Sequence, residues 1–558
     1  MNKYFFYLLG LCSAFLFFSA CQDTSESAAI DKSTSSTTKE KGNTPFLKGT
    51  YFEGANGIFF DNKDRLHVGS VVGRKIGVVD TDTGEIIEKL GPEEGVEGAD
   101  DVTIGPDGSI YYTDILTGEV GRRTPSGEVT KQMVALGVNP ITFSDDGRLF
   151  VALDFIGDGL YELDPELKNP PRLIIKELGW LNAMDFGPDG LLYGPIWTKG
   201  QIVKIDVDKA ELTVVVDDLN TPAAVKFDSK GNLFTVDNFT GIIWQIDPKT
   251  GAKVEIAQGF IGGDNLAFNS KDELFLSSAR DGGIFQVNMD GTHRVVINNS
   301  FCNAADIAIL GNSLFVADIF SLKSYNKNTS VPNPTQRQMI GIPGLIGPFT
   351  IDHADDQFIL TSWFSNEVQI WDAKENKQIA LFADFMVPLN AIFVDDGFIV
   401  AELGNQPGQA KIYRQVGDDR EVLMDGTKGL AVPAGLAAAN GNIYAADFYT
   451  GVVYQITEKG KTLATPKVII KDLKQPEGIK IGPKGNLIVV ETGTNQVLSI
   501  NLSNGEKSVL VNNIPLGLSA TPNMPPTWKI SDIDYDELGN LYVPSDIENT
   551  IYKIEKAF

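Results

Sequence analysis

The sequence predicts an all-β protein of two consecutive six-bladed β-propellers, with twelve four-stranded blades, after a lipoprotein signal and a flexible tether. A strand–turn–strand pattern recurs along residues 46–558, with first strands near residues 57, 101, 140, 183, 224, 265, 306, 348, 391, 435, 478 and 532. The repeat length of about 43 residues is typical of four-stranded blades. Because closed rings usually hold four to eight blades, twelve repeats favour two rings of six over one ring of twelve.

The N-terminus has the pattern of a secretory signal. A short positive start precedes a mostly apolar run, 4–18, which ends in small residues before Cys21. This end resembles the lipobox of bacterial lipoproteins, which implies that residues 1–20 are removed and that Cys21 is lipidated. Phe18 stands where the lipobox usually has Leu. An uncleaved signal anchor is the alternative, although the run is shorter than the roughly 20 residues that span a membrane.

Residues 21–45 are expected to be a disordered tether. After Cys21 they contain no aromatic residue and are rich in Ser, Thr, Lys and Glu, so they cannot bury enough apolar surface to fold. Because Gln22 rather than Asp follows the cysteine, the lipoprotein resemblance implies the outer membrane or cell surface of a Gram-negative cell. The sequence therefore predicts a cell-envelope lipoprotein that contacts the membrane through its lipid anchor.

The composition excludes several classes of function. The 558 residues include 47 Lys and Arg against 73 Asp and Glu, a net charge of −26 that would repel nucleic-acid phosphates, so we expect no nucleic-acid partner. Three Cys cannot form a disulfide framework, and three His leave little for a transition-metal site. Asp, Asn and Glu are therefore the main residues that remain for a polar binding or catalytic site.

The repeats can be read strand by strand. In ADDVTIGPDGSIYYTD (99–114) and AAVKFDSKGNLFTVDN (223–238), two alternating strands flank a four-residue turn that ends in Gly. Such turns suit a type I conformation with Gly in the left-handed position. A third strand, as in GIIWQIDPKTG (241–251), and a fourth, as in ELTVVVDDL (211–219), complete each antiparallel blade.

The chain ends suggest how the rings close. The folded part opens with a piece resembling a fourth strand, 45–52, and stops after a third strand. Since an open blade edge invites aggregation, we expect 45–52 to complete the sixth blade and 293–301 to complete the twelfth. This divides the chain near Gly291 into propellers at 46–290 and 291–558. A single twelve-bladed ring would also use the terminal strand, so the ends alone leave both arrangements open.

These repeats resemble the SMP-30/gluconolactonase/LRE family of six-bladed propellers, as well as NHL-type and streptogramin-lyase-like repeats. The resemblance covers nearly all of residues 46–558. It implies a fold more strongly than a chemistry, because propeller scaffolds host many functions.

The candidate site residues occupy the same position in each first strand, four residues before the apolar residue that precedes the turn. We call this position the channel step, because the first strands of a propeller line its central channel. In the first ring five of these six residues carry side-chain oxygens, and they are Asn56, Asp100, Asn139, Asn182 and Asp264, with Ala223 the sixth. In the second ring they are Ala305, Gly347, Leu389, Ala434, Glu477 and Ser531. If these polar residues served only to maintain the fold, we would expect both rings to carry them at this position. Oxygens converging on an axis make a hard-cation site, so we expect the five to bind a divalent metal, most simply Ca²⁺.

The family resemblance implies metal ligands at this same step, with two departures. Asn56 replaces the family's first-blade Glu, and Ala223 stands at its fifth-blade ligand. Asp264 and Asp100 are the candidate catalytic residues, because only carboxylates at these positions can accept a proton or attack a carbonyl. The alternative is that each of these residues caps a strand or turn.

Other motifs have structural readings. Asp114, Asp154, Asp237, Asp318 and Asp447 follow second strands in both rings, which indicates a turn device. The tryptophans are interpreted as blade packing, with Trp180 the one placed to line a ligand pocket. His67, His293 and His353 all lie off the channel positions, which disfavours streptogramin-lyase chemistry.

Two functions of different class follow. The first is a divalent-metal-dependent hydrolase of a lactone or related ester, acting on a small molecule in the first propeller's channel. The alternative is a non-catalytic propeller scaffold that binds a protein or other ligand at the cell surface.

Overall fold

The computed structural model describes residues 43–558 except 320, 334–336, 339–344, 346, 376 and 521–523. The predicted signal, Cys21 and most of the predicted tether lie outside the described residues. Within the described part of the chain, no helix combines the length and apolar character needed to cross a membrane.

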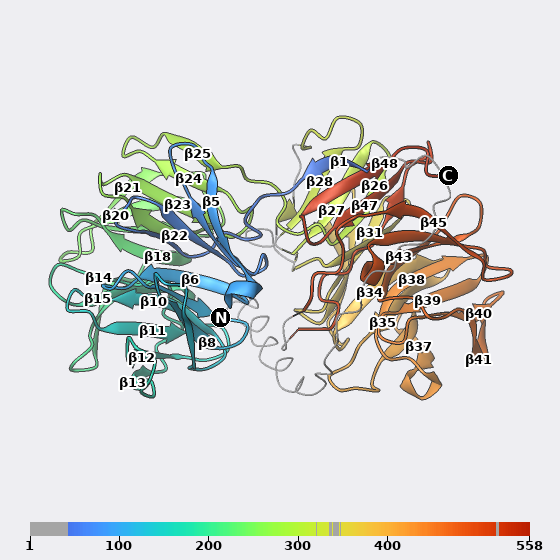
Figure 1. The fold of residues 1–558 in the computed structure, drawn as a ribbon, viewed down its shortest axis with the longest axis horizontal. Coiled ribbons are helices and arrows are strands. Elements are labelled where there is room, and N and C mark those ends of the chain that lie inside the picture. Colours follow the sequence, from blue (N-terminus) through green and yellow to red (C-terminus); the bar gives the residue numbers. More distant parts are fainter. Residues whose placement is uncertain are drawn as a thin grey trace.

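The described chain forms twelve four-stranded antiparallel sheets, which confirms the predicted fold class (Figure 1). Contacts between first strands join the sheets into two rings, because β2 meets β22 in one ring and β26 meets β46 in the other. We call these the first and second propellers. They lie side by side in Figure 1, the first coloured blue to green and the second mainly yellow to red.

The first propeller consists of strands β2 to β25, taken in chain order. Its first three sheets are β2 (Ile58–Phe60), β3 (Leu66–Ser70), β4 (Lys75–Val79), β5 (Ile86–Leu90); β6 (Ala99–Ile104), β7 (Ile110–Asp114), β8 (Glu119–Arg123), β9 (Val129–Met133); β10 (Val138–Phe143), β11 (Leu149–Leu153), β12 (Gly159–Leu163), β13 (Arg172–Lys176). The next three are β14 (Asp185–Phe186), β15 (Leu192–Ile196), β16 (Gln201–Asp206), β17 (Glu211–Val216); β18 (Pro222–Phe227), β19 (Leu233–Asp237), β20 (Ile242–Ile246), β21 (Lys253–Ala257); β22 (Gly263–Phe268), β23 (Leu274–Ser278), β24 (Ile284–Val287), β25 (His293–Ile297).

The second propeller combines strands β26 to β48 with β1. Its first three sheets are β26 (Asp306–Leu310), β27 (Ser313–Asp318), β28 (Ser321–Asn326), β29 (Arg337–Gln338); β30 (Thr350–Ala354), β31 (Gln357–Ser362), β32 (Glu367–Asp372), β33 (Lys377–Phe382); β34 (Pro388–Val394), β35 (Gly397–Glu402), β36 (Lys411–Val416), β37 (Asp419–Asp425). The last three are β38 (Pro433–Ala439), β39 (Asn442–Asp447), β40 (Val452–Glu458), β41 (Lys461–Ile470); β42 (Pro476–Ile481), β43 (Leu487–Glu491), β44 (Gln496–Ile500), β45 (Lys507–Asn512); β46 (Asp534–Tyr535), β47 (Leu541–Ser545), β48 (Thr550–Ile554), β1 (Thr44–Lys48).

Four short 3₁₀ turns are present in the described chain. Two lie between successive sheets, η3 (Pro92–Glu94) and η5 (Gly426–Lys428), and two lie between the second and third strands of one sheet, η4 (Trp197–Lys199) and η6 (Thr492–Thr494). Hydrophobic cores fill the spaces between neighbouring sheets. One such core joins the fifth and sixth sheets through Phe234, Val236, Leu266 and Leu276. The rings are therefore held by packing between blades, as propellers require.

The predicted strand exchange is wrong. Strand β1 pairs with β48 and completes the last sheet of the second propeller, while β25 pairs with β24 and completes the sixth sheet of the first. The predicted boundary near Gly291 therefore falls within the sixth sheet. Both strands are edge strands with similar alternation, and any sheet edge offers the same backbone groups, so local pattern could not choose between them.

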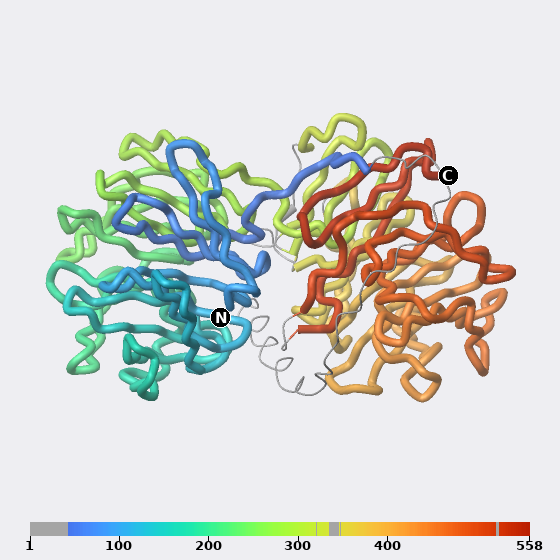
Figure 2. The backbone as a smooth tube through the Cα atoms, in the orientation of Figure 1, coloured from blue at the N-terminus to red at the C-terminus, as the bar shows by residue number. Residues whose placement is uncertain are grey.

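The first propeller is consequently an insertion within the second. The chain starts in the second propeller with β1, crosses to build all six sheets of the first, and crosses back before β26 (Figure 2). The first propeller closes without borrowing a distant strand. Its last and first blades are joined where Ser277 Oγ donates to the Asn56 carbonyl at 2.6 Å.

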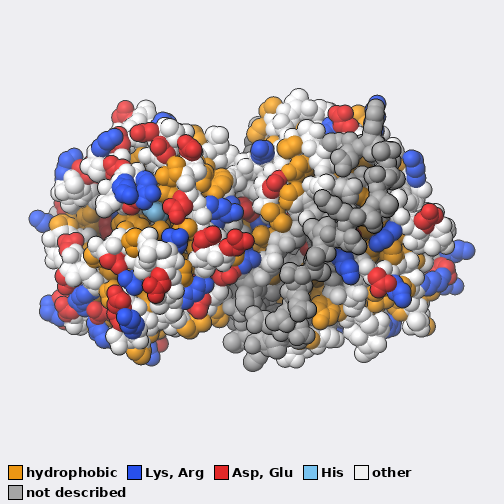
Figure 3. Space-filling model, viewed as in Figure 1, with side chains coloured by type: hydrophobic (Ala, Val, Ile, Leu, Met, Phe, Trp, Pro, Cys, Tyr) orange, Lys and Arg blue, Asp and Glu red, His pale blue; other side chains and the backbone are white. Residues whose placement is uncertain are grey.

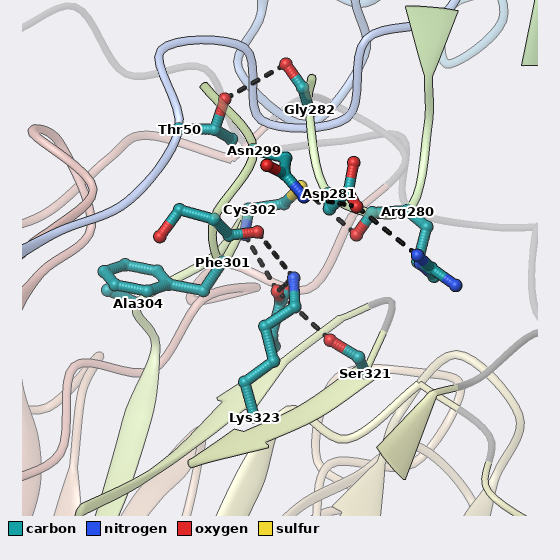
Figure 4. A network of polar contacts seen from close by, with 12 residues as sticks. Thr50, Arg280, Asp281, Gly282, Asn299, Phe301, Cys302, Ala304, Ser321 and Lys323 are labelled. Atoms are coloured by element: carbon teal, nitrogen blue, oxygen red, sulfur yellow. Dashed lines mark hydrogen bonds and ion pairs between the residues drawn. The ribbon is translucent and has the colours of Figure 1, made fainter. Parts of the chain in front are cut away.

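The two crossing segments run together and share hydrogen bonds (Figure 4). Thr50 Oγ1 donates to the Gly282 carbonyl at 3.1 Å, and Asn549 Nδ2 donates to the carbonyls of Thr50 and Phe301, both at 3.1 Å. Beneath them Lys323 Nζ lies 2.9 Å from Asp318 Oδ2. These hydrogen bonds attach the two crossing segments to both propellers.

Loops of the first propeller pack into the mouth of the second. Val72 and Leu116 join an apolar cluster whose buried members from the second propeller are Phe349, Trp363, Val387, Leu389, Leu403, Val432, Met524, Trp528 and Ile530. Lys529 donates to the Glu53 carboxylate across this interface, and Arg74 donates to the Ser519 carbonyl. Apolar side chains, including Leu389 at the channel step, therefore fill the entrance of the second propeller.

Charged side chains of both signs are spread over the face seen in Figure 3, with hydrophobic ones between them. The apolar cluster between the propellers is buried at their interface, whereas the face seen in Figure 3 mixes charged and hydrophobic side chains.

Candidate functional site

The structure brings all five predicted residues of the first ring together around one cavity of about 60 Å³. Its lining also includes other residues, which are Gly57, Asp101, Phe155, Ala183, Ala223 and Asn265. A cavity of this size can hold an ion with a small number of waters, and is far below the several hundred Å³ of an ordinary small-molecule pocket. The metal-binding and catalytic roles of the five remain predictions.

Local backbone irregularities explain why these side chains reach the cavity. The pairing of first and second strands shifts between Ala99 and Val102, and again between Gly263 and Leu266. Asp100 and Asp264 lie inside these shifts, and Asn139 lies in the equivalent shift of β10. Because a β-bulge adds an unpaired residue and re-aims its side chain, these three first strands can present a polar group to the axis. Asn56 and Asn182 instead lie just before β2 and β14 begin.

Asp100 and Asn139 are buried polar side chains without a bonding partner. Asp100 is 6% exposed and Asn139 is 7% exposed, and neither side chain makes a hydrogen bond or ion pair to the described residues. Burial raises the pKa of Asp100 well above its ordinary value, and the nearby Asp264 and Asp101 raise it further. An unpaired buried carboxylate is costly, so this one is expected to take up a proton or a cation.

Asp264 faces the same cavity and is partly exposed to it. Burial, followed by repulsion from Asp101, raises its pKa to about 7, while a hydrogen bond from Asn56 acts in the opposite direction. A carboxyl group that titrates near neutrality suits a general base at physiological pH. The two carboxylates predicted as catalytic thus differ, since only Asp264 has a hydrogen bond from an amide side chain, that of Asn56.

Asp101, which the sequence interpretation passed over, is a structural carboxylate. Its two oxygens accept from the backbone N–H groups of Val102 and Ile141 at 2.9 and 3.1 Å, and Asn265 Nδ2 lies 3.4 Å away. The bond to Ile141 joins the second blade to the third. Asp306, Asp352 and Asp534 make the same kind of bond to the next first strand. Asp101 and Asp306 stand one residue after the channel step, but Asp352 and Asp534 stand five and three residues after it, so no single offset in the sequence identifies the device.

The turn device predicted for the aspartates after second strands is seen in the structure, with one departure. Asp114, Asp237 and Asp447 accept backbone N–H groups of their own blade connections. Asp154 accepts the Phe155 backbone N–H at 2.8 Å and, unlike the others, has both oxygens 3.1 Å from the indole nitrogen of Trp197. Burial raises the pKa of Asp154 to about 7, although the indole hydrogen bond lowers it.

An aromatic group borders the cavity at the third and fourth blades. The rings of Trp180 and Trp197 are stacked with centroids 5.5 Å apart, and Phe155 lies 5.7 Å from Trp197. Phe155 and Trp180 have φ angles of 62° and 69°, a left-handed conformation that is unusual for bulky residues. Only Trp180 was singled out by the sequence. Trp371 is buried between blades as predicted, whereas Trp363 and Trp528 are buried in the apolar cluster between the two propellers.

The second propeller lacks a matching site at the same step. Glu477 is its one carboxylate there, and it accepts from Thr527 Oγ1 and from the Ser531 backbone N–H, both at 2.7 Å. Its oxygens are therefore occupied by structural hydrogen bonds, in contrast to those of Asp100. The expected difference between the two rings is present in the geometry.

The cavity fits a hard cation better than a transition metal. Among the residues that the structure describes, no group of three His, Cys, Asp or Glu side chains could hold a metal ion by itself. A cation here would need the carboxylates of Asp100 and Asp264, the amide oxygens and water, which is the ligand type that Ca²⁺ accepts. None of the three histidines lines the cavity. The free oxygens of Asp100 supply the unsatisfied charge that such an ion would neutralise.

We expect the protein to lose stability as the pH rises from 5 to 8 in the presence of chelator. The pKa of Asp154 is raised to about 7 and that of Asp532 is raised chiefly by burial, so the folded state holds more protons than the unfolded state in this range. Stability therefore falls with pH, by an amount on the order of a few kcal/mol. His67 opposes this trend, because burial lowers its pKa.

Urea unfolding at several pH values measures this effect. Asp154→Asn keeps an oxygen for the Trp197 indole but cannot ionise, so it should flatten the pH profile. A variant profile as steep as that of the parent would contradict the assignment to Asp154.

Comparisons with known proteins identify no family. No family model matches the chain, and no curated protein matches it. Among solved structures, virginiamycin B lyase from Staphylococcus aureus is 15% identical, with a TM-score of 0.37, over 49% of this chain and 94% of its own. A gluconolactonase from Xanthomonas campestris is 15% identical, with a TM-score of 0.35, over 42% and 84%. The extracellular domain of a one-component system from B. thetaiotaomicron is 9% identical, with a TM-score of 0.32, over 92% and 77%.

The fold and the site together define a protein with tandem β-propellers and one oxygen-lined, acidic channel cavity. The likeness to the solved structures concerns the fold alone. Any statement about activity must therefore come from the cavity.

Proposed function

We propose that this protein is a divalent-cation-dependent hydrolase of a lactone or related ester, with its site in the first propeller's channel. The observation that carries the proposal is the unpartnered, buried carboxylate of Asp100 in a cavity that is also lined by four Asn and two further Asp residues. Lipidation at Cys21 would hold this activity at the cell envelope.

The residues of the cavity would have two roles, which are to hold the cation and to activate or supply the nucleophile. Asp100 and Asp264, with the amide oxygens of Asn56, Asn139 and Asn182, would hold the cation, most simply Ca²⁺. When bound, such an ion polarises a carbonyl group and stabilises the negative charge that develops on its oxygen. Asp264 would accept the proton of an attacking water, or would itself attack the carbonyl carbon. The remaining bulk of the substrate must stay outside, because the cavity is only about 60 Å³.

A non-catalytic binding propeller is the second candidate. The small cavity favours it, since an ion alone could fill the space and fix the surrounding loops for a ligand at the surface. Both candidate functions include a bound cation, and only the first includes catalytic turnover.

Calorimetric titration of the soluble fragment 43–558 with Ca²⁺, Mg²⁺ and Zn²⁺ tests the cation first. We expect one binding site per chain, with Ca²⁺ preferred. A panel of lactones and aryl esters with and without the preferred cation then tests hydrolysis. Binding without turnover would favour the second candidate, and absence of binding by all three cations would contradict both.

A further inference from the structure

Apolar side chains form a rim around the cavity on the side of the first propeller that is free of the second. We define this rim as Phe155, Trp180, Trp197, Phe239 and Ile261. Phe155 lines the cavity, and the other four come from connections at the same end of blades three to six. The corresponding loops of blades one and two instead pack into the second propeller through Val72 and Leu116.

Hydrogen bonds tie the rim to the strands that supply the cavity residues. Asn182 N donates to the Pro195 carbonyl at 3.0 Å, which fixes the segment after Trp180 against the strand before Trp197. On the far side, Asn238 Nδ2 donates to the Gly263 carbonyl at 2.9 Å, next to Asp264. Phe239 follows Asn238 directly, so its loop is attached at the edge of the cavity.

The rim is exposed to solvent, although Phe155, Trp180 and Trp197 are also in ring contact with one another. Phe239 is 50% exposed and Ile261 is 36% exposed, while Phe155, Trp180 and Trp197 are partly exposed. An apolar surface that borders a polar cavity is typical of a site for a ligand with an apolar part. Asp100 provides the independent sign of a ligand, because it is a buried carboxylate that faces the cavity without a partner.

The shape and charge of the site restrict that ligand. No Lys or Arg lines the cavity, so an anionic substrate would meet uncompensated carboxylates. A cavity of about 60 Å³ admits a carbonyl group but not a whole sugar ring, so the rest of the molecule must lie on the rim. The rim offers ring faces and an aliphatic side chain, which contact hydrocarbon better than hydroxyl groups.

We propose that the substrate is an uncharged lactone or ester with an apolar acyl or aryl arm, whose carbonyl enters the acidic cavity while the arm lies on the aromatic rim. This inference rests on the proposed hydrolase function and names its substrate class. Sugar lactones, which carry hydroxyl groups where the rim is apolar, are the contrasting class.

The experiment compares γ-dodecalactone, γ-butyrolactone and glucono-δ-lactone with the Ca²⁺-loaded fragment 43–558. We expect kcat/KM for γ-dodecalactone to exceed the other two by at least tenfold. Phe239→Ser should reduce kcat/KM for γ-dodecalactone on the order of tenfold and leave γ-butyrolactone unchanged. Ca²⁺ affinity should stay at the parent value, because Phe239 does not line the cavity.

The chain supplies a matched control. Tyr449 occupies the corresponding loop of the second propeller, in DFYTG (447–451) against DNFTG (237–241), and it is 73% exposed. Tyr449→Ser should therefore change neither substrate's kinetics. Both variants alter an exposed loop residue, so both are expected to fold.

Binding separates this inference from the hydrolase proposal. If no lactone is turned over, quenching of tryptophan fluorescence by γ-dodecalactone still tests the rim, and weaker quenching in Phe239→Ser supports it. Equal kcat/KM values for the long and short arms, a preference for glucono-δ-lactone, or no effect of Phe239→Ser on turnover and binding would overturn it.

Discussion

Replacing Asp100 by Asn is expected to weaken Ca²⁺ binding by about a hundredfold or more. The change removes the charge of one of the two carboxylates proposed as cation ligands, Asp100 and Asp264, and keeps a side-chain oxygen, and Ca²⁺ affinity depends strongly on the number of charged ligands. In chelator the same variant should be more stable than the parent, because an unpartnered buried carboxylate is replaced by a neutral amide. Calorimetry and urea unfolding measure the two effects.

Asp264→Ala extends this test to catalysis. It should weaken cation binding and abolish any hydrolysis, since Asp264 is the candidate base or nucleophile. The matched control is Glu477→Gln in the second propeller, which keeps an oxygen for the Thr527 and Ser531 donors. Glu477→Ala would be a poorer control, because it would leave the Ser531 N–H unsatisfied. Unchanged cation affinity in both Asp variants would remove the basis of the proposed site.

Removing strand β1 is expected to destabilise the second propeller by several kcal/mol while leaving the first unchanged. The strand closes the last sheet by pairing with β48 from the opposite end of the chain. Its Phe46 packs edge-on against Tyr542 with ring centroids 5.6 Å apart, and Leu47 borders the same core. Loss of these contacts costs about 2 kcal/mol for each apolar side chain, and the open edge adds an aggregation risk.

The comparison uses a chain that starts at Asn43 and a chain that starts at Gly49. Fluorescence and urea unfolding should show a lower midpoint for the transition of the second propeller only. If β25 completed this sheet, as the sequence suggested, the two chains would unfold alike. A cut near Gly291 would then separate the propellers cleanly, whereas the structure predicts that it damages the sixth sheet by detaching β25.

The repeat pattern predicted the blades because the information is local. Alternation within a strand and Gly at the left-handed turn position, as at Gly108 and Gly231, specify each hairpin from a few neighbouring residues. The polar step of the first ring was predictable for the same reason. A fixed offset from each turn identifies one position in every first strand, and the strands meet on the ring axis.

The distinction between Asp100 and Asp101 could not be predicted from that offset. The two residues are adjacent and chemically identical, yet one is bonded to the next blade and the other has no partner among the described residues. The outcome depends on the bulge in β6 and on the position of Ile141 in another blade. Neither is visible in the local sequence around the pair.

The sequence by itself determined the strand repeats, the turns, the contrast between the two rings and the set of five polar residues, because each follows from short-range periodicity. The tertiary structure alone decided which sheet β1 completes, how small the cavity is, and that Phe155 lines it in ring contact with Trp197. These features arise where residues far apart in the chain meet. Sheet edges present the same backbone groups everywhere, so only the packing of the whole ring selects the partner.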